Sequence, residues 1–298
     1  MPRPRDEMLA RIVEWARGCA DVDALVLTGS LARGDSTADA WSDIDIEIIS
    51  PSPERFLASD RWINDFGEVA IVMRLDGDEH HPWPTRLVLY ADGVRVDFTL
   101  ADAQRVTGMI ENRQLDALYA RGYAVLIDKR GQCESLPPPL PIPQSTPLPT
   151  QVELSEAIGR FWFEATHVPK YLARGELWLA SSRHWAMLCA LLQVAQWHAL
   201  AHGKPPVDVW YGGRGVSEWL APEHRNALAS CFGGFNTDDI QCAFEATIEL
   251  FVTLGRELAT TAGLSFPEGI ERSVRSHLHS TDPRQHKTPG PGGGPGGS

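Results

Sequence analysis

The first 130 residues combine a helical pattern with several stretches in which apolar and polar residues alternate. Residues 5–19 carry apolar side chains three and four positions apart, which predicts an amphipathic helix packed on another element. Residues 101–119 predict a second helix. Ala91-Asp92-Gly93 is typical of a tight turn, so the strands on either side are expected to be antiparallel neighbours. Alternating or continuously apolar segments predict six strands, at 24–29, 43–49, 69–75, 86–90, 94–100 and 123–128.

The pattern changes after a proline-rich stretch. Residues 136–149 contain seven prolines, and such a segment forms neither a helix nor a central strand because proline lacks an amide hydrogen. The last residues, KTPGPGGGPGGS, have too few apolar side chains to offset the cost of ordering and are predicted to be disordered. Between these two segments, long helical periods predict helices at 151–176, 178–202, 216–231, 236–262 and 267–279.

These patterns predict an α+β protein with two domains, and 298 residues are enough for two separate cores. We expect a mixed sheet domain over residues 1–135, a proline-rich linker over 136–150 and a helical bundle domain over 151–280. Residues 281–298 are expected to form a disordered tail.

The composition narrows the range of partners. The formal net charge of −12 argues against a nucleic-acid surface, because affinity for phosphate backbones comes from clustered Lys and Arg, and it suits a cationic small molecule better. No apolar run reaches the length of a membrane span and no signal-peptide pattern begins the chain, so we expect a cytoplasmic protein without membrane contact, either a monomer or a homodimer. The five cysteines have no C-x-x-C spacing and are expected to be reduced and mostly buried.

Two aspartates flank one isoleucine in the predicted strand DIDIEII. Alternate side chains of a strand share a face, so Asp43, Asp45 and Glu47 point to one side and the isoleucines point to the core. Neighbouring carboxylates on one face raise each other's pKa unless a cation lies between them. Mg²⁺ is such a cation, since it prefers oxygen ligands and is often held by one or two carboxylates together with substrate phosphates.

A glycine-serine pair and a third aspartate complete the candidate site. Gly29 allows a close backbone approach, and exposed amide groups followed by the Ser30 hydroxyl are able to bind phosphate oxygens. Asp97 alternates with the apolar residues of VRVDFTL and therefore faces away from them. If this strand lies beside DIDIEII, three carboxylates converge. Three acidic ligands and a phosphate seat are typical of two-metal phosphoryl or nucleotidyl transfer.

This combination resembles the nucleotidyltransferase superfamily that includes DNA polymerase beta, and more narrowly the aminoglycoside 6-adenylyltransferases, also called streptomycin adenylyltransferases. The resemblance covers most of residues 5–280 and is carried by LTGSLARGDSTADAWSDIDIEII, SDRWINDFGEVAIVMR, LYADGVRVDFTL, AVLIDK, FWFEATHVPKYLARGELWLA and HGKPPVDVWYGGRG. It implies a nucleotidyltransferase-type mixed sheet domain followed by a helical domain. It also implies an enzyme that transfers AMP from ATP to a hydroxyl of a cationic aminoglycoside, most closely streptomycin at the 6-position, releases pyrophosphate and confers antibiotic resistance.

The resemblance implies a role for each acidic residue of the site. Asp43 and Asp45 would bind metal, and Asp97 would bind the catalytic metal and assist deprotonation of the attacking hydroxyl. Two Mg²⁺ ions are expected, with ATP as co-substrate.

The resemblance also implies a set of nucleotide-binding residues. Gly29 and Ser30 would bind the triphosphate, and Lys170 matches a lysine of the family's helical domain that reaches the nucleotide phosphates. Arg33 in GSLARG is a further phosphate ligand candidate, with a solvated loop arginine as the alternative. Glu164 is a weaker candidate for a general base.

Several alternatives stay open at this point. The same chemistry is compatible with a lincosamide, a protein hydroxyl or a tRNA end as acceptor, and a fold of this kind also occurs in catalytically silent nucleotide-binding modules. His198 and His202 lie four residues apart on one helix face, yet no third metal ligand follows at a recognisable spacing, so a surface or core role is favoured. Most tryptophans of the second half are expected in the core, with one or two lining an acceptor pocket: those at 162, 178, 185, 197, 210 and 219.

Overall fold

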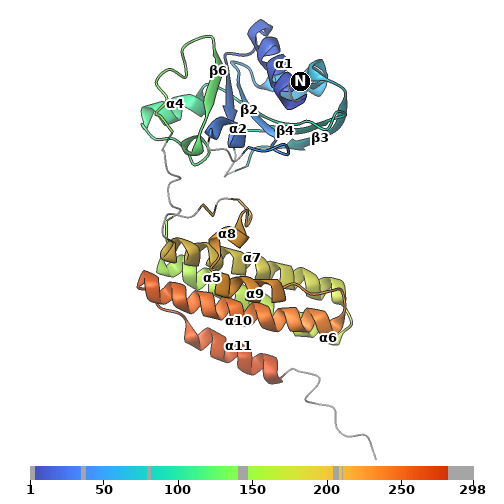
Figure 1. Cartoon of the computed structure of the whole chain (residues 1–298), viewed down its shortest axis with the longest axis vertical. Coiled ribbons are helices and arrows are strands. Elements are labelled where there is room, and N and C mark those ends of the chain that lie inside the picture. The colour runs from blue at the N-terminus through green and yellow to red at the C-terminus, as the bar shows by residue number, and fades with distance from the viewer. Residues whose placement is uncertain are drawn as a thin grey trace, which may run out of the picture. The chain divides into compact units, whose positions relative to one another are not determined.

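The computed structural model describes residues 4–34, 38–78, 82–139, 147–203, 208–209 and 211–280. The chain divides into two compact units, Met1–Gln144 and Ser145–Ser298, and the division falls within the proline-rich stretch 136–150 (Figure 1). The predicted tail at 281–298 and Trp210 lie outside the described residues.

A six-stranded mixed sheet forms the centre of the first unit, in the order β3-β4-β5-β2-β1-β6. Strands β2 and β5 are parallel, whereas the other neighbours are antiparallel, including the predicted hairpin of β4 and β5. All six predicted strands are confirmed: β1 (Ala24–Thr28), β2 (Ile44–Ile49), β3 (Val69–Leu75), β4 (Thr85–Tyr90), β5 (Arg95–Ala101) and β6 (Ala124–Asp128).

Both faces of the sheet are packed. Met8 and Ile12 of α1 (Pro4–Gly18) are fully buried against the face that carries Ile44, Ile46 and other apolar residues, as the alternation in DIDIEII predicts. The second helix, α4 (Gln104–Glu111), covers part of the opposite face. It is shorter than the predicted helix over 101–119. Ala101 still belongs to β5, and the helix ends at Glu111 with Asn112 as its C-cap.

Four short segments join these elements and were not predicted from the sequence. Each is seven residues or fewer, too short for a periodic pattern to identify. They are α2 (Gly29–Arg33), α3 (Glu54–Ala58), and the 3₁₀ segments η1 (Asp60–Phe66) and η2 (Tyr119–Arg121).

The second unit consists of helices in its described part (Figure 1). Three predicted helices are confirmed as single elements, and the predicted helices 151–176 and 216–231 are each divided in two. The new helices after these breaks begin with Pro169 and Pro222 in their first turn, where proline is tolerated although it cannot continue a helix. The elements are α5 (Gln151–Ala165), α6 (Val168–Ala173), α7 (Leu177–His202), α8 (Val216–Trp219), α9 (Pro222–Ser230), α10 (Thr237–Ala262) and α11 (Glu268–Ser280).

Aromatic packing holds the centre of this unit. The rings of Phe161 on α5 and Phe251 on α10 stack with their centroids 3.6 Å apart, and both side chains are fully buried. Trp162, Trp197 and Trp219 are also buried, as expected. In contrast, Trp178 and Trp185 on α7 are 79% and 62% exposed, because they lie on the side of the helix that faces away from the core.

The five cysteines are free thiols, as predicted. The expectation that most of them are buried is wrong, since only Cys133 and Cys231 are buried, while Cys189 and Cys242 lie exposed on α7 and α10. Within the described ranges, none of the helices combines the length and apolarity needed to cross a membrane.

Candidate active site

The candidate site begins where β1 ends. Gly29 has a φ of +67°, a left-handed conformation that favours glycine, and it starts the short helix α2. A side chain at this position would overlap the carboxylate of Asp45, so the backbone of residue 29 lies directly against that group. Ser30 and Arg33 follow on α2. The sequence-predicted pair Gly29-Ser30 therefore does lie beside the aspartate strand.

Two neighbouring strands carry acidic residues of the candidate site. Asp45 on β2 is opposite Thr28 on β1 and, on its other side, opposite Asp97 on β5. Residues opposite each other on paired strands point to the same face of the sheet, so Asp45 and Asp97 share a face and Asp43 precedes them just before β2. The predicted adjacency of the two aspartate strands is confirmed, whereas the convergence of all three carboxylates stays a prediction.

The electrostatics of this cluster favour a bound cation. Burial raises the pKa of Asp45 above its ordinary value, the Asp43 carboxylate adds to the shift, and the Arg33 guanidinium opposes it. Burial likewise raises the pKa of Asp97 to about 7, and the Asp45 and Asp43 carboxylates contribute further. These carboxylates therefore disfavour one another's charged forms. A divalent cation among them would remove the conflict.

The donor set fits Mg²⁺. All three groups offer hard carboxylate oxygens, and each side chain is only partly buried, which leaves room for water and phosphate ligands. Among the described residues, the strand registers place no histidine or cysteine opposite Asp45 or Asp97. The cluster therefore matches the ligand preference of Mg²⁺ rather than that of zinc.

The remaining predicted residues lie in the second unit. Lys170 is exposed on α6, and its ammonium group lies 5.3 Å from the ring centroid of Tyr171. Glu164 lies near the end of α5, where its carboxylate pairs with Arg183 at 3.2 Å. Because α5 ends at Ala165 and α6 starts at Val168, Glu164 and Lys170 do not share the single helix that the sequence predicted.

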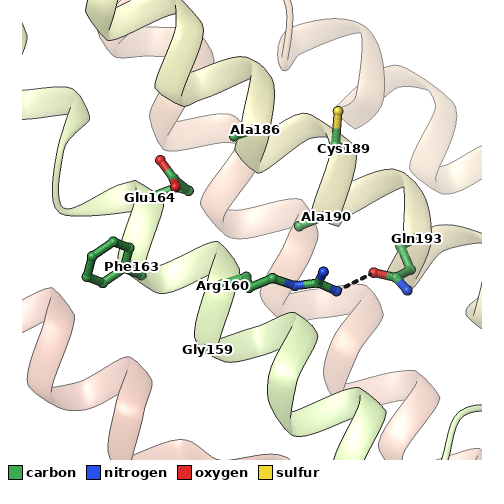
Figure 2. Close-up of a pocket in the computed structure, with 8 residues that line it drawn as sticks. All are labelled: Gly159, Arg160, Phe163, Glu164, Ala186, Cys189, Ala190 and Gln193. Carbon is green, nitrogen blue, oxygen red and sulfur yellow. Dashed lines mark hydrogen bonds between the residues drawn. The ribbon is translucent and has the colours of Figure 1, made fainter. Parts of the chain in front are cut away.

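A pocket of about 450 Å³ lies between α5 and α7 in this unit (Figure 2). Glu164 and the 65%-exposed Phe163 line it on the α5 side. Arg160 crosses toward Gln193 of α7 and donates a hydrogen bond to it at 3.1 Å. The pocket thus combines the aromatic face of Phe163 with one carboxylate, Glu164, and one guanidinium, Arg160.

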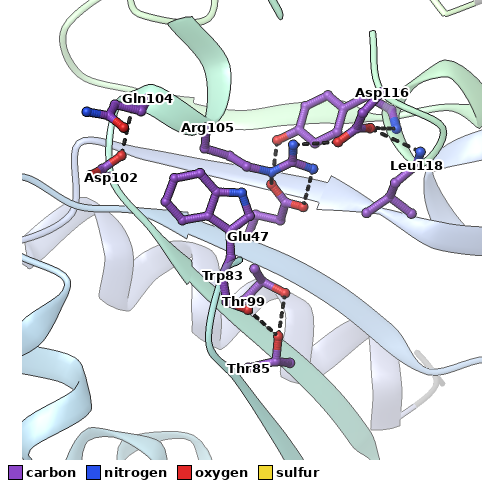
Figure 3. Close-up of polar contacts among 10 residues, drawn as sticks. Glu47, Trp83, Thr85, Thr99, Asp102, Gln104, Arg105, Asp116 and Leu118 are labelled. Carbon is purple, nitrogen blue, oxygen red and sulfur yellow. Dashed lines mark hydrogen bonds and ion pairs between the residues drawn. The ribbon is translucent and has the colours of Figure 1, made fainter. Parts of the chain in front are cut away.

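The structure also shows a buried polar network that the sequence did not indicate (Figure 3). Glu47 is 2% exposed and does not join Asp45 and Asp97, although it shares their face of the sheet. Arg105 of α4 donates two hydrogen bonds to its carboxylate, at 2.9 and 3.0 Å, and Tyr119 donates a third at 2.7 Å. Arg105 also pairs with Asp116.

A charged residue within an apolar strand is a signal that a partner must exist. The partner itself was not identifiable, because Arg105 follows Glu47 by 58 residues. The network binds β2 to α4 only two positions beyond Asp45 and so supports the strand that carries the candidate site.

The chain is similar in sequence to proteins of known function. The chain is 25% identical to the aminoglycoside 6-adenylyltransferase of Bacillus subtilis (strain 168) over 202 residues, which are 66% of this chain and 69% of that protein. It is 20% identical to the aminoglycoside 6-adenylyltransferase of Staphylococcus aureus over 287 residues, which are 93% of this chain and 100% of that protein.

A solved structure is also similar. The crystal structure of an aminoglycoside 6-adenyltransferase from Bacillus subtilis has 18% identity and a TM-score of 0.43, with 93% of this chain and 99% of that chain covered. The model of the streptomycin adenylyltransferase family matches residues 2–281, and on this match over nearly its whole length the chain belongs to that family.

Proposed function

We propose that this member of a nucleotidyltransferase enzyme family transfers AMP from ATP to a hydroxyl of an aminoglycoside, namely streptomycin at its 6-position, and so confers antibiotic resistance. The observation that carries the proposal is the position of Asp45, in register with Asp97 and in contact with the backbone at Gly29. The names of the relatives support an aminoglycoside acceptor, and the name of the family supports streptomycin within that class.

We assign Asp43, Asp45 and Asp97 as ligands of two Mg²⁺ ions. The mutual repulsion of these carboxylates, expressed in the raised pKa values of Asp45 and Asp97, supports the assignment. When bound, Mg²⁺ would lower the pKa of the acceptor hydroxyl and stabilise charge on the leaving pyrophosphate.

The triphosphate is assigned to four residues. The left-handed turn at Gly29 exposes the first amides of α2, and the Ser30 hydroxyl follows them. Arg33 lies close enough to Asp45 to lower the pKa of that carboxyl, which supports a guanidinium beside the same phosphates. Lys170 is assigned on the family resemblance, and its exposure leaves its ammonium accessible to a ligand.

The chemistry is a single displacement at phosphorus. The acceptor oxygen bonds to the α-phosphorus while the bond to the oxygen that bridges the α- and β-phosphorus atoms breaks, and pyrophosphate leaves with that oxygen. Asp97 takes the proton of the acceptor hydroxyl.

A cationic acceptor agrees with the charge of the chain. Asp and Glu number 39 against 27 Lys and Arg, so the average surface attracts a polycation such as streptomycin. In the second unit, Trp178 and Trp185 expose aromatic faces, which attract cationic groups.

The test is pyrophosphate release from ATP and Mg²⁺ with streptomycin, spectinomycin, kanamycin, lincomycin or no acceptor. We expect release with streptomycin, and we expect Asp45→Ala to lower it by at least about 100-fold, since a metal ligand supplies several kcal/mol of transition-state stabilisation. Asp76→Ala removes an exposed carboxylate of the same unit and serves as the matched control with unchanged release.

The panel also separates the competing functions. Release that depends on lincomycin alone would show that the acceptor is a lincosamide and not an aminoglycoside. The assignment of the metal site would not change. ATP binding without release in any reaction would indicate a silent nucleotide-binding module, and full activity of Asp45→Ala would refute the assigned metal site.

A further inference from the structure

Three residues of the second unit converge away from the residues assigned to adenylyl transfer. His198 lies on α7, His224 on α9 and Glu257 on α10. Each offers one ligand atom, and the three atoms lie within 4.8 Å of one another. Glu257 Oε2 is 2.8 Å from His198 Nε2 and 3.2 Å from His224 Nε2. Two imidazoles and one carboxylate are thus gathered from three helices.

The spacing is close to that of a zinc centre. Zinc bonds of about 2.0–2.2 Å in a tetrahedron place the ligand atoms about 3.3 Å apart, so the two nitrogen-oxygen distances observed here need to change by only about half an ångström. Both imidazoles have little exposure, with side chains 6% and 11% exposed, whereas the Glu257 side chain is 44% exposed. The cluster is therefore enclosed on the histidine side and accessible to an ion and a water molecule on the carboxylate side.

The histidine pair suggested by the sequence is not the one the structure assembles. His202 stacks on His198 with a centroid distance of 4.1 Å, but both of its ring nitrogens are engaged. Nδ1 lies 2.9 Å from the backbone carbonyl of His198, and Nε2 lies 2.8 Å from the Thr261 hydroxyl. His202 consequently supports the ring of His198 from behind and is not a ligand candidate.

Helix α9 is short. It has nine residues, fewer than an isolated helix needs to be stable in water, and His224 is its buried side chain. Within the described ranges, Glu257 pairs with these two imidazoles and with no Lys or Arg, so no cationic side chain competes for the carboxylate. An ion held here would link α9 to the two long helices.

We propose that His198, His224 and Glu257 bind a zinc-type divalent cation, with water as the fourth ligand, and that this ion ties α9 to α7 and α10. Imidazole ligands suit zinc and cobalt, whereas Mg²⁺ prefers oxygen, so this site and the aspartate cluster of the first unit select different ions. The proposal uses none of the residues assigned to adenylyl transfer.

The test measures zinc binding to the full chain after removal of metals with a chelator. Competition with a chromophoric chelator should give one tight site per chain, and Co²⁺ should produce the visible absorption bands of a tetrahedral complex. Zinc at about 100 times its Kd should raise the Tm of the helical signal in circular dichroism by about 5–10 °C.

Two ligand variants and one control assign the site. Glu257→Gln and His224→Gln should each weaken zinc binding by at least about 100-fold and abolish the Co²⁺ bands, since each removes one of three protein ligands. His202→Gln should retain tight binding. If His224→Gln fails to fold, Glu257→Gln decides the question. This variant is expected to fold, because residue 257 is half-exposed and a carboxamide has nearly the same shape as a carboxylate.

Other outcomes would overturn the proposal. The chain has ten histidines, so zinc that binds equally well to wild type and to Glu257→Gln would be adventitious. Loss of binding in His202→Gln but not in His224→Gln would assign the ion to the pair on α7 instead. Absence of stoichiometric binding by the wild-type chain would exclude the site.

Discussion

Gly29 and Asp45 lie in direct contact, and no side chain fits between them. A Cβ at residue 29 would overlap the Asp45 carboxylate, and residues other than glycine rarely adopt a φ of +67°. The glycine thus allows the backbone at the start of α2 to approach the acidic cluster. This contact joins the proposed phosphate seat to the proposed metal ligands.

Gly29→Ala should therefore abolish adenylyl transfer, because the new methyl group must displace either Asp45 or the start of α2. Gly34 is a matched control, since its φ is +66° but a Cβ there would meet no atom within 4 Å. Gly34→Ala should cost only the backbone strain, about 1–2 kcal/mol of stability, with activity retained. Pyrophosphate release and thermal unfolding of both variants check this, and equal activity losses would show that backbone strain alone is responsible.

Asp97 should make the metal-free protein less stable as the pH rises. Its pKa is raised from 3.8 to about 7, so between these values the folded state binds more protons than the unfolded state. The free energy of unfolding then decreases with increasing pH across that window. Thermal unfolding in the presence of a chelator should show this decrease, and the decrease should be smaller in Asp97→Asn, where the raised pKa of Asp45 still contributes to it. An identical pH dependence of both proteins would contradict the raised pKa.

Breaking the buried pair of Glu47 and Arg105 should be strongly destabilising. Their side chains are 3% and 8% exposed, so Glu47→Gln leaves a buried guanidinium with less compensation and should lower the free energy of unfolding by about 3 kcal/mol. Replacing both residues by Met should be less damaging than the single change. Urea unfolding measures these differences.

The exposed pair of Arg55 and Asp21 provides the control for this comparison. Its side chains are 65% and 34% exposed, and Arg55→Ala should cost less than about 1 kcal/mol. If the two ion pairs contributed equally, burial would not be the reason for the stability of the network.

Lys170→Ala should raise the KM for ATP by about tenfold or more, because a hydrogen bond between charged groups contributes about 1.5–3 kcal/mol. The Tm should not change, since Lys170 is exposed on α6. Arg174→Ala removes an exposed cation just beyond the same helix and should leave the KM unchanged. Steady-state kinetics with ATP as the varied substrate give the KM of each variant. An equal rise in KM for Lys170→Ala and Arg174→Ala would indicate that the loss of any positive charge has this effect, and not the loss of Lys170 itself.

Most of the secondary structure was predictable because it depends on short-range patterns. The alternation in DIDIEII correctly placed Ile44 and Ile46 in the core, and the hairpin around Asp92 followed from its turn residues. The long helices α7 and α10 matched their predicted ranges within one residue at each end. The errors occurred at the short elements and at helix breaks, such as the one before Pro169, where one or two residues override the period.

The candidate site was partly predictable. The types and spacing of Gly29, Asp43 and Asp45 indicate metal and phosphate chemistry by themselves, because all three belong to one turn and one strand. The inclusion of Asp97 depended on β5 lying beside β2, which only the strand order establishes.

The sequence by itself thus identified the candidate metal and phosphate ligands and the face of each strand that they occupy. The tertiary structure decided what lies opposite them. Asp45 and Glu47 share one face of β2. Asp97 lies opposite Asp45 on the neighbouring strand, whereas Arg105 and Tyr119 donate hydrogen bonds to Glu47. His198 similarly meets His224 and Glu257 from two other helices, in addition to its helical neighbour His202. Local periodicity specifies the direction of a side chain, but its partners come from distant segments and are set by packing.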